Sequence, residues 1–431
     1  MRMEIPPAVD RIIKQLEEHG YEAYAVGGCV RDTLLGRIPE DWDITTSAKP
    51  EEVKAIFRRT IDTGIQHGTV TVMENHVGYE VTTYRIDGEY EDGRHPKSVA
   101  YTANLTEDLK RRDFTINAMA YSPQNGMVDA FGGEADLEQK IIRCVGKPTD
   151  RFTEDALRIL RAIRFSAQLG FSIEHDTFEG IREIAPNLAK VSKERVQAEL
   201  TKLLVSAHPE KIASVFERGV APYISKRFQQ VWSDLEMASQ ENTVFQEEST
   251  CWFPANSLCG WEEKFQYPLG EEKYLRWAAF LRFSGEQGAE QVLRDLKMDN
   301  DTISKSALLA KWCYEPITAE KTAVRKVMAQ MDTELFFKLL ELRKFAIHAD
   351  FMDEEKRQEL LQELDEIRKM AEEICADGDC LYIKDLAVTG RDLIASGMKP
   401  GKEIGEVLGR FLDEVLERPE HNTKEYLLGM R

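Results

Sequence analysis

Three carboxylates are the first candidates for chemistry in this chain. Asp41 and Asp43 flank Trp42, and the Ile-Thr-Thr that follows favours a β-strand. Residues two apart on a strand point to the same face, so these carboxylates would repel each other unless a cation lay between them. Glu80, in the strand-like YEVTTYR, would add a third carboxylate from a neighbouring strand. Two Mg²⁺ ions are the usual solution for in-line phosphoryl chemistry. Taken alone, the Asp pair is more often two solvent-facing acids on an edge strand.

A second motif, which ends nine residues before Asp41, changes that balance. The segment GGCVRD, from Gly27 to Asp32, follows the apolar run AYAV. Two glycines at a strand-to-helix turn let backbone N–H groups approach a phosphate, and a helix N-terminus favours an anion. Arg31 adds a cation. A tight turn before an ordinary helix is the alternative, but the nearby Asp pair favours a phosphate-binding turn.

A third motif, RRDFTINAMA, begins at Arg111 and places two arginines and an aspartate before a helix-like segment. Arg112 and Asp113 are therefore candidates to hold a triphosphate and to read a ribose hydroxyl. A charged helix start with Asp113 as the N-cap is the structural alternative, and both interpretations can hold together.

The fourth motif is TEDALRILRAIRF, in which Asp155 and Arg158 lie three residues apart on a predicted helix. An intrahelical ion pair is the plain interpretation. The functional one is base reading, because cytosine and adenine both offer an amino donor beside a ring-nitrogen acceptor. Aspartate accepts from the amino group and arginine donates to the ring nitrogen, whereas uracil and guanine present the opposite pattern. Arg161 and Arg164 continue the same side of the helix.

The elements that must position these residues fall into two regions. Residues 20–145 mix short apolar runs with turns; strands are predicted at YEAYAVGG, DWDIT, GTVTVM and YEVTTYR, and helices at PEEVKAIFRR and from Arg31 to Leu35. After Pro148 the apolar spacing becomes helical and stays so, apart from a polar, turn-rich segment at 238–262 that is predicted to be a loop. The sequence thus predicts an α/β domain followed by a long all-α region.

Composition sets further limits. The 431 residues are 42% hydrophobic and 31% charged, which is typical of globular chains, and their length predicts two to four domains. No stretch approaches the ~20 apolar residues of a membrane helix, and the N-terminus lacks a signal-like core, so a cytoplasmic protein is expected. Seven scattered cysteines without a CxxC pair favour reduced, structural thiols. The net charge of −19 opposes nucleic-acid binding at first sight, yet residues 101–165 hold ten acidic and ten basic side chains.

Taken in order, the motifs GGxxRD, DxD, RRDFTxNAM and EDxxRxxR resemble those of class II tRNA nucleotidyltransferases, the bacterial CCA-adding enzymes, within the poly(A) polymerase/tRNA nucleotidyltransferase family. The resemblance covers about residues 20–205, including SKERVQAELTKLL. The C-terminal VTGRDLIASGMKPGKEIGEVLGRFLDEVLERPEHNTKEYLL also resembles the tail of the shorter Gram-positive enzymes.

The resemblance implies a DNA polymerase β-like nucleotidyltransferase head followed by an all-α neck, body and tail. The corresponding boundaries are 1–145 for the head, 146–206 for the neck, 207–317 for the body and 318–431 for the tail. It further implies that the neck recognises the nucleotide base, and that body and tail bind the acceptor and TΨC arms of tRNA. No membrane or protein partner is implied.

The same resemblance assigns roles to residues. Two Mg²⁺ ions would be held by Asp41 and Asp43 with Glu80 in support, and CTP and ATP would be the substrates. The remaining site residues form two sets: the triphosphate and ribose set is Gly27, Gly28, Arg31, Arg112, Asp113 and Asn117, and the base-recognition set is Asp155, Arg158, Arg161 and Arg164. Residues 86–96, IDGEYEDGRHP, would form the flexible loop that helps the switch from C to A.

Three alternatives stay open. Poly(A) polymerases carry a basic C-terminus and a basic GRRF-like segment, whereas the corresponding residues 60–73, TIDTGIQHGTVTVM, contain no arginine. An enzyme that adds A alone has no distinguishing signal here, while a CC-only enzyme would have a shortened 86–96 loop. A non-catalytic RNA-binding protein would have lost an acidic metal ligand, yet Asp41 and Asp43 are both present.

Overall fold

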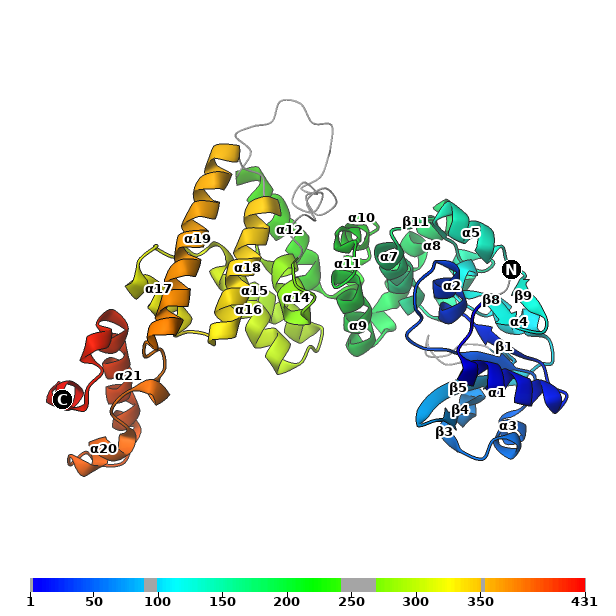
Figure 1. Ribbon diagram of the computed structural model, residues 1–431. Coiled ribbons are helices and arrows are strands. Elements are labelled where there is room, and N and C mark those ends of the chain that lie inside the picture. The colour runs from blue at the N-terminus through cyan, green and yellow to red at the C-terminus, as the bar shows by residue number, and fades with distance from the viewer. Residues whose placement is uncertain (1–2, 89–98, 242–268, 350–352, 431) are drawn as a thin grey trace. The chain divides into compact units, whose positions relative to one another are not determined.

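The structure is a computed structural model that describes residues 3–88, 99–241, 269–349 and 353–430. The chain divides into two compact units (Figure 1). One unit consists of Met1–Gln229 with Asp295–Lys297, and the other of Gln230–Arg294 with Met298–Arg431. This division is coarser than the four parts predicted from the sequence, which stay a prediction.

A mixed seven-stranded sheet organises the first part of the first unit. Its order is β3-β4-β5-β2-β1-β8-β9, with β2 parallel to β5 and the other neighbouring pairs antiparallel. The four strands predicted from the sequence are confirmed as β1, β2, β4 and β5. The bounds are β1 Ala23–Val26, β2 Ile44–Thr46, β3 Thr60–Gly64, β4 Thr69–Glu74, β5 Val77–Thr83, β8 Met119–Ser122 and β9 Gly126–Asp129.

Helices cover this sheet, as expected of the predicted α/β domain. α1 (Pro7–Glu18) and α3 (Pro50–Ile56) contact each other and the strands β1, β2, β4 and β5, while α2 (Gly28–Leu34) packs against β1 and β8. Beside the sheet, α4 (Leu105–Lys110) closes a core made by Tyr24, Val26, Tyr84, Leu105, Leu109, Ala118, Ala120 and Val145. β1 and β8 are buried along their whole length, so the turns that leave them start from the packed core.

Smaller elements complete this region. A two-stranded ribbon of β6 (Arg85–Asp87) and β7 (Val99–Tyr101) flanks residues 89–98, so most of the loop predicted at 86–96 lies outside the described residues. The remaining elements are η1 Ile65–His67, η2 Thr115–Asn117, α5 Gly133–Gln139 and the parallel pair β10 Ile141–Ile142 with β11 Ser172–Ile173.

The helix predicted after Pro148 is in fact two helices. α6 (Pro148–Glu154) ends just before Asp155, whose backbone is extended at φ −144° and ψ 103°, and α7 (Leu157–Leu169) begins two residues after Asp155. α6 packs on α8 (His175–Ile184), and α7 packs on α9 (Lys193–Leu204). Short elements finish the unit: η3 Ala185–Lys190, η4 Pro209–Ile212, α10 Ala213–Glu217 and α11 Ala221–Ile224.

The second unit is helical, which confirms the all-α prediction. α12 (Lys226–Glu241) enters it and runs four residues into the segment predicted to be a loop from 238; residues 242–268 lie outside the described part. The following helices are α14 Lys273–Leu281, α15 Gly285–Asp295, α16 Asn300–Tyr314, α17 Lys321–Met328, α18 Thr333–Ala349, α19 Glu354–Asp377, α20 Gly390–Ala395, α21 Lys402–Glu417 and α22 Lys424–Gly429, with the short η5 Ile383–Asp385 and η6 Pro419–His421. Among the helices described, none is long and apolar enough to cross a membrane.

Candidate active site

The three predicted carboxylates lie in the region where β2 and β5 run side by side, and Glu80 is within electrostatic reach of Asp41 and Asp43. Ile44 pairs with Val81 in the parallel register of these strands, so Asp43 and Glu80 each lie one residue before a paired position. The prediction that Asp41 and Asp43 lie on a strand is wrong, because β2 begins at Ile44, three residues after Asp41 and one after Asp43. The Asp43 carbonyl still accepts a hydrogen bond from the Val26 N–H at 3.0 Å, which ties this end of the motif to β1.

These carboxylates are accessible, and the pKa values of Asp43 and Glu80 are raised. Asp41, Asp43 and Glu80 are all exposed to solvent. Desolvation by the surrounding protein raises the pKa of Asp43, Arg112 opposes this effect, and the negative charge of Asp41 adds to it. Desolvation also raises the pKa of Glu80, helped by the charges of Asp43 and Asp41. A cation at this position would relieve the repulsion.

These carboxylates suit Mg²⁺, which substrate phosphates help to bind, better than a metal ion whose ligands all come from the protein. Among the described residues, no group of three or more His, Cys, Asp and Glu side chains is gathered closely enough to hold a metal ion. Mg²⁺, however, is usually bound by one or two carboxylates together with substrate phosphates. Asp41 and Asp43 supply such carboxylates, and Glu80 lies within electrostatic reach of both.

The predicted phosphate-binding turn requires glycine at its first position. Gly27 precedes α2 with φ 82° and ψ −128°, a conformation that L side chains rarely adopt. A Cβ atom built on Gly27 would lie 2.9 Å from Nη1 of Arg112. Gly28 is the first residue of α2, and space for a Cβ exists there, with Arg31 3.7 Å away. The turn therefore brings the backbone up against a guanidinium group.

Replacing Gly27 with Ala should both destabilise the protein and displace Arg112. We expect about 1–3 kcal/mol of backbone strain and roughly a tenfold loss of activity, since the new methyl group overlaps the guanidinium. Gly36→Ala is a matched control, because Gly36 has φ 69° but open space around its Cβ position. Thermal unfolding measures the loss of stability, and nucleotide incorporation measures the effect of displacing Arg112. Equal loss of activity in Gly27→Ala and Gly36→Ala would contradict the steric argument.

Asp108 is a supporting residue that the sequence interpretation missed. Its carboxylate is fully buried, accepts hydrogen bonds from Nε and Nη2 of Arg111 at 3.0 and 2.9 Å, and lies 3.6 Å from Nη2 of Arg112. Burial would raise the pKa of Asp108, but these two arginines hold it below its ordinary value. The sequence pattern that could have revealed it is an aspartate three residues before Arg111 and four before Arg112, a spacing that places the three side chains on one face of a helix.

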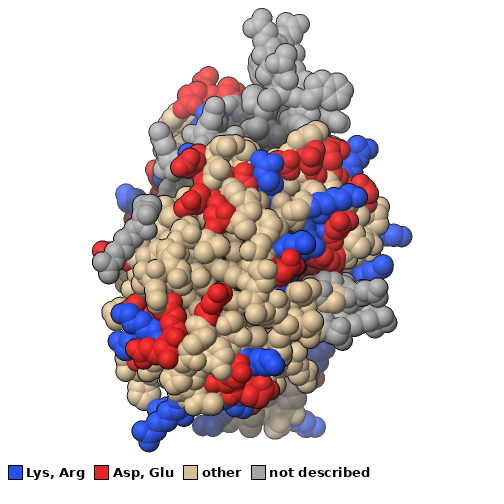
Figure 2. Space-filling view, turned by 90° about the vertical axis from the view of Figure 1, so that its right-hand side faces the viewer, with Lys and Arg blue, Asp and Glu red and all other residues tan. Residues whose placement is uncertain are grey.

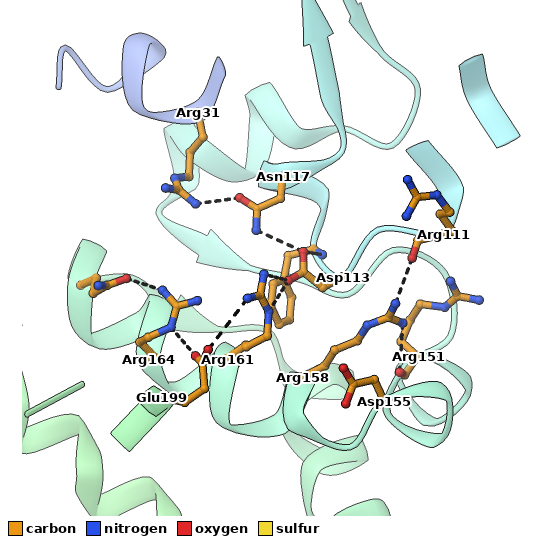
Figure 3. Close-up of polar contacts among 12 residues, drawn as sticks. Arg31, Arg111, Asp113, Asn117, Arg151, Asp155, Arg158, Arg161, Arg164 and Glu199 are labelled. Atoms are coloured by element: carbon orange, nitrogen blue, oxygen red, sulfur yellow. Dashed lines mark hydrogen bonds and ion pairs between the residues drawn. The ribbon is translucent and has the colours of Figure 1, made fainter. Parts of the chain in front are cut away.

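A continuous chain of polar contacts links the glycine turn to α7 (Figure 3). Arg31 donates through Nη1 to Oδ1 of Asn117 at 2.7 Å, and Asn117 donates through Nδ2 to Oδ1 of Asp113 at 3.1 Å. Arg161 then donates through Nε and Nη2 to Oδ2 of Asp113 at 2.9 and 2.6 Å. The structure therefore brings together four predicted site residues that come from three separate motifs.

The segment that follows Asp113 corrects two predictions. It forms the 3₁₀ turn η2 and then strand β8 rather than a helix, and Asp113 is not an N-cap, since the residue before η2 is Phe114. Asp113 Oδ1 accepts from the N–H of Phe114 at 2.9 Å as well as from Asn117. With two donors on each oxygen, its roughly four acceptor sites are occupied. A direct ribose contact would have to displace one of them.

The charge of Asp113 should make the protein sensitive to acid. Burial would raise the pKa of Asp113, but Arg161 and Arg158 hold it well below its ordinary value. A depressed carboxylate pKa stabilises the fold above the unfolded value of about 3.9, and this stability disappears as the pH falls further. We expect Asp113→Asn to cost about 3 kcal/mol at pH 7 and progressively less below pH 4. Unfolding midpoints from pH 3 to 7 measure this, and a pH-independent difference would contradict it.

The predicted base-reading pair does not form an intrahelical ion pair. Asp155, at the break between α6 and α7, accepts from Nη1 and Nη2 of Arg195 at 3.3 and 2.7 Å. Arg158 donates to Oε2 of Glu154 at 2.6 Å and to the carbonyls of Arg151 and Arg111 at 3.1 Å. Glu154 and Arg195 were missed in the sequence, although Glu154 begins the EDxxR motif.

Arg164 lies behind the site rather than in it. Only 6% of its surface is exposed; it hydrogen-bonds Glu199 and donates to Oε1 of Gln168 at 2.5 Å, and its guanidinium lies 3.9 Å from the centroid of the Phe165 ring. These contacts already engage its guanidinium, and the assignment of Arg164 to the base-recognition set stays a prediction. Arg164 lies three residues after Arg161 on α7, and its side chain points toward Glu199 of α9.

Charge is mixed on the face of the molecule shown in Figure 2. Acidic and basic side chains alternate around an uncharged centre, so this face carries no single-sign field. The net charge of −19 is an average over the chain and does not describe each surface.

Three family models match successive parts of the chain. The Poly A polymerase head domain matches residues 23–143, the "Probable RNA and SrmB-binding site of polymerase A" matches 170–228, and tRNA nucleotidyltransferase domain 2 matches 270–430. The first match contains the carboxylates and the glycine turn.

Individual proteins show the same similarity. The CCA-adding enzyme of Leuconostoc mesenteroides subsp. mesenteroides is 54% identical over 196 residues, an alignment that spans 46% of this chain and 49% of that one. The CCA-adding enzyme of Ligilactobacillus salivarius is 34% identical over 422 residues, 97% of this chain and 94% of that one. The crystal structure of the Bacillus stearothermophilus CCA-adding enzyme in complex with CTP is 31% identical, covers 99% of this chain and 98% of its own, and has a TM-score of 0.76.

Proposed function

This chain belongs to the CCA-adding enzymes of the poly(A) polymerase/tRNA nucleotidyltransferase family, and on that premise we propose that it adds C, C and A in turn to the 3′ end of tRNA, using CTP and ATP. The observation that carries the proposal is the placement of Asp41, Asp43 and Glu80 beside Arg112, which itself abuts the Gly27 turn. Carboxylates beside a phosphate-binding turn suit nucleotidyl transfer. A cytoplasmic location is part of the same proposal.

In the proposed reaction the terminal hydroxyl of tRNA attacks the α-phosphate of CTP or ATP. A new P–O bond forms as the hydroxyl loses its proton to solvent, the bond between the α-phosphorus and the oxygen that bridges to the β-phosphate breaks, and pyrophosphate leaves. Asp41 and Asp43, supported by Glu80, would hold two Mg²⁺ ions. When bound, these ions supply charge neutralisation for the attacking and leaving oxygens. The N–H group of Gly28 and the guanidinium of Arg112 would hold the triphosphate in line, whereas the N–H of Gly27 already donates to the carbonyl of Met119 at 3.1 Å.

Arg31, Asn117, Asp113 and Arg161 would act mainly as a frame. Their hydrogen bonds join α2, η2 and α7. The Gly27–Gly28 turn before α2 and the break at Asp155 before α7 are therefore connected through one network of contacts. Asp113 was predicted to contact the ribose; its four occupied acceptor positions favour a positioning role instead. Such a frame keeps triphosphate and base in one orientation, which matters because an error of about 1 Å can reduce the rate by roughly a hundredfold.

Base choice would rest on Asp155 and Arg158. Both side chains are largely buried, with 15% and 12% exposed; Asp155 accepts hydrogen bonds from Arg195, and Arg158 donates to the carbonyl of Arg151. A carboxylate and a guanidinium held in this way can accept from an amino group and donate to a ring nitrogen without a nucleic-acid template. The proposal therefore includes selection of C and A against U and G.

Product length tests the proposal against its nearest alternatives. With tRNA lacking CCA, CTP alone should add two nucleotides, CTP with ATP should add three, and extension should then stop. Gel sizing of the products from each nucleotide set measures this. Long A tails on unstructured RNA would indicate a poly(A) polymerase, and extension restricted to tRNA ending in CC would indicate an enzyme that adds A alone.

A further inference from the structure

Helix α9 holds both halves of the base-reading region through two residues one turn apart. Arg195 forms the bidentate pair with Asp155, and Glu199 pairs with Arg164 and lies 4.0 Å from Nη1 of Arg161. Side-chain exposure is 22% for Arg195 and 15% for Asp155, so the pair is largely shielded from water. A shielded, bidentate guanidinium–carboxylate pair fixes the orientation of both groups.

The hydrogen bonds to Asp155 leave very little of its accepting capacity unused. Oδ1 accepts from the N–H of Leu157 at 3.0 Å and from Nη1 of Arg195 at 3.3 Å, and Oδ2 accepts from Nη2 of Arg195 at 2.7 Å. An ionised carboxylate has about four acceptor positions. Among the described residues, these three donors are its hydrogen-bond partners, which leaves one position, on Oδ2.

We propose that Arg195 is a positioning residue for base selection, which fixes Asp155 so that a single Oδ2 position receives the amino group of cytosine or adenine. This inference rests on the proposed function. An amino group supplies the one N–H that the position needs. Uracil and guanine would place a carbonyl oxygen against a carboxylate that Arg195 prevents from turning away. Selection thus depends on the orientation of Asp155 as well as on its charge.

Arg195→Ala tests this role. We expect the ratio of kcat/KM for UTP to that for CTP to rise roughly tenfold on tRNA lacking CCA, mainly through a higher KM for CTP, since a charged hydrogen bond becomes poorly oriented. Arg218→Ala is the matched control. Arg218 also pairs with a carboxylate, that of Glu179 at 3.3 Å, and has a similar exposure of 27%. It should leave the UTP-to-CTP ratio unchanged.

Arg195→Lys separates positioning from simple charge neutralisation. Lysine keeps the charge but lacks the planar fork that grips both carboxylate oxygens. We expect it to restore the thermal stability of the wild-type protein but not its selectivity, and it provides a folded variant if Arg195→Ala does not fold. A wild-type UTP-to-CTP ratio in Arg195→Lys, or in a folded Arg195→Ala, would overturn the proposal. Failure of the wild-type protein itself to add C in preference to U would overturn the proposed function instead.

Discussion

Replacing Asp43 with Asn should lower kcat for nucleotide addition by about a thousandfold, equivalent to about 4 kcal/mol of transition-state stabilisation. The carboxylate of Asp43 is exposed to solvent, and desolvation together with the charge of Asp41 raises its pKa, while the charges of Asp43 and Asp41 add to the raised pKa of Glu80. Substitution by the neutral amide removes one of two proposed Mg²⁺ ligands while keeping the shape of the side chain. Asp41→Asn should have an effect of similar size.

The same substitution should not unfold the protein. Desolvation and Asp41 raise the pKa of Asp43, which means that the folded state disfavours its charged form. Removing that charge should leave the unfolding temperature unchanged or slightly higher, and tRNA binding should persist. The measurements are single-turnover incorporation across a Mg²⁺ titration, thermal unfolding and a tRNA binding assay. Near-normal incorporation by both Asp41→Asn and Asp43→Asn would remove the two-metal proposal.

Strands and helices with strong local patterns could be predicted from the sequence. AYAV and TVTV are apolar and β-branched, and both became strands, β1 and β4. The position of strand and helix ends was harder to predict. Asp41 and Asp43 precede β2 instead of lying in it, and the helix predicted through Asp155 breaks there. At Asp155 the side chain caps the N–H of Leu157 and pairs with Arg195, and no periodicity of apolar residues signals such a break.

The residues of the candidate site also differ in how well the sequence predicts them. Residues that act through their own local motif, such as Gly27 and Asp43, were predictable because type and spacing carry the chemistry. The hydrogen-bond partners of the site residues could not be predicted, because Asp155 pairs with Arg195, 40 residues away, and not with Arg158. A spacing of three residues predicts neighbours on an unbroken helix, and tertiary contact with α9 overrode it. Glu199 and Arg195 came from a stretch, SKERVQAEL, that reads as an ordinary amphipathic helix.

Asp155→Asn should reduce kcat/KM for CTP and ATP by roughly ten- to a hundredfold, as expected for loss of a charged hydrogen bond worth about 1.5–3 kcal/mol. Discrimination against UTP and GTP should fall as well, because the amide can turn its NH₂ group toward their carbonyl oxygens. Asp155→Asn is a cleaner test than Arg158→Ala. Arg158 also binds Glu154 and the carbonyls of Arg151 and Arg111, so its removal would weaken the contact between α7 and the preceding segments.

A surface pair provides the control for this prediction. Asp10 pairs with Lys14 at 2.7 Å on α1, one turn apart, with 28% and 60% of their side chains exposed, and such an i,i+4 pair is worth about 0.3–0.5 kcal/mol. Asp10→Asn should therefore leave all four nucleotide efficiencies unchanged. The measurement is kcat/KM for CTP, ATP, UTP and GTP on tRNA lacking CCA and on tRNA ending in CC, with thermal unfolding of each variant. If Asp155→Asn kept the wild-type ranking of the four nucleotides, Asp155 would be a structural cap between α6 and α7, and base choice would have to lie elsewhere.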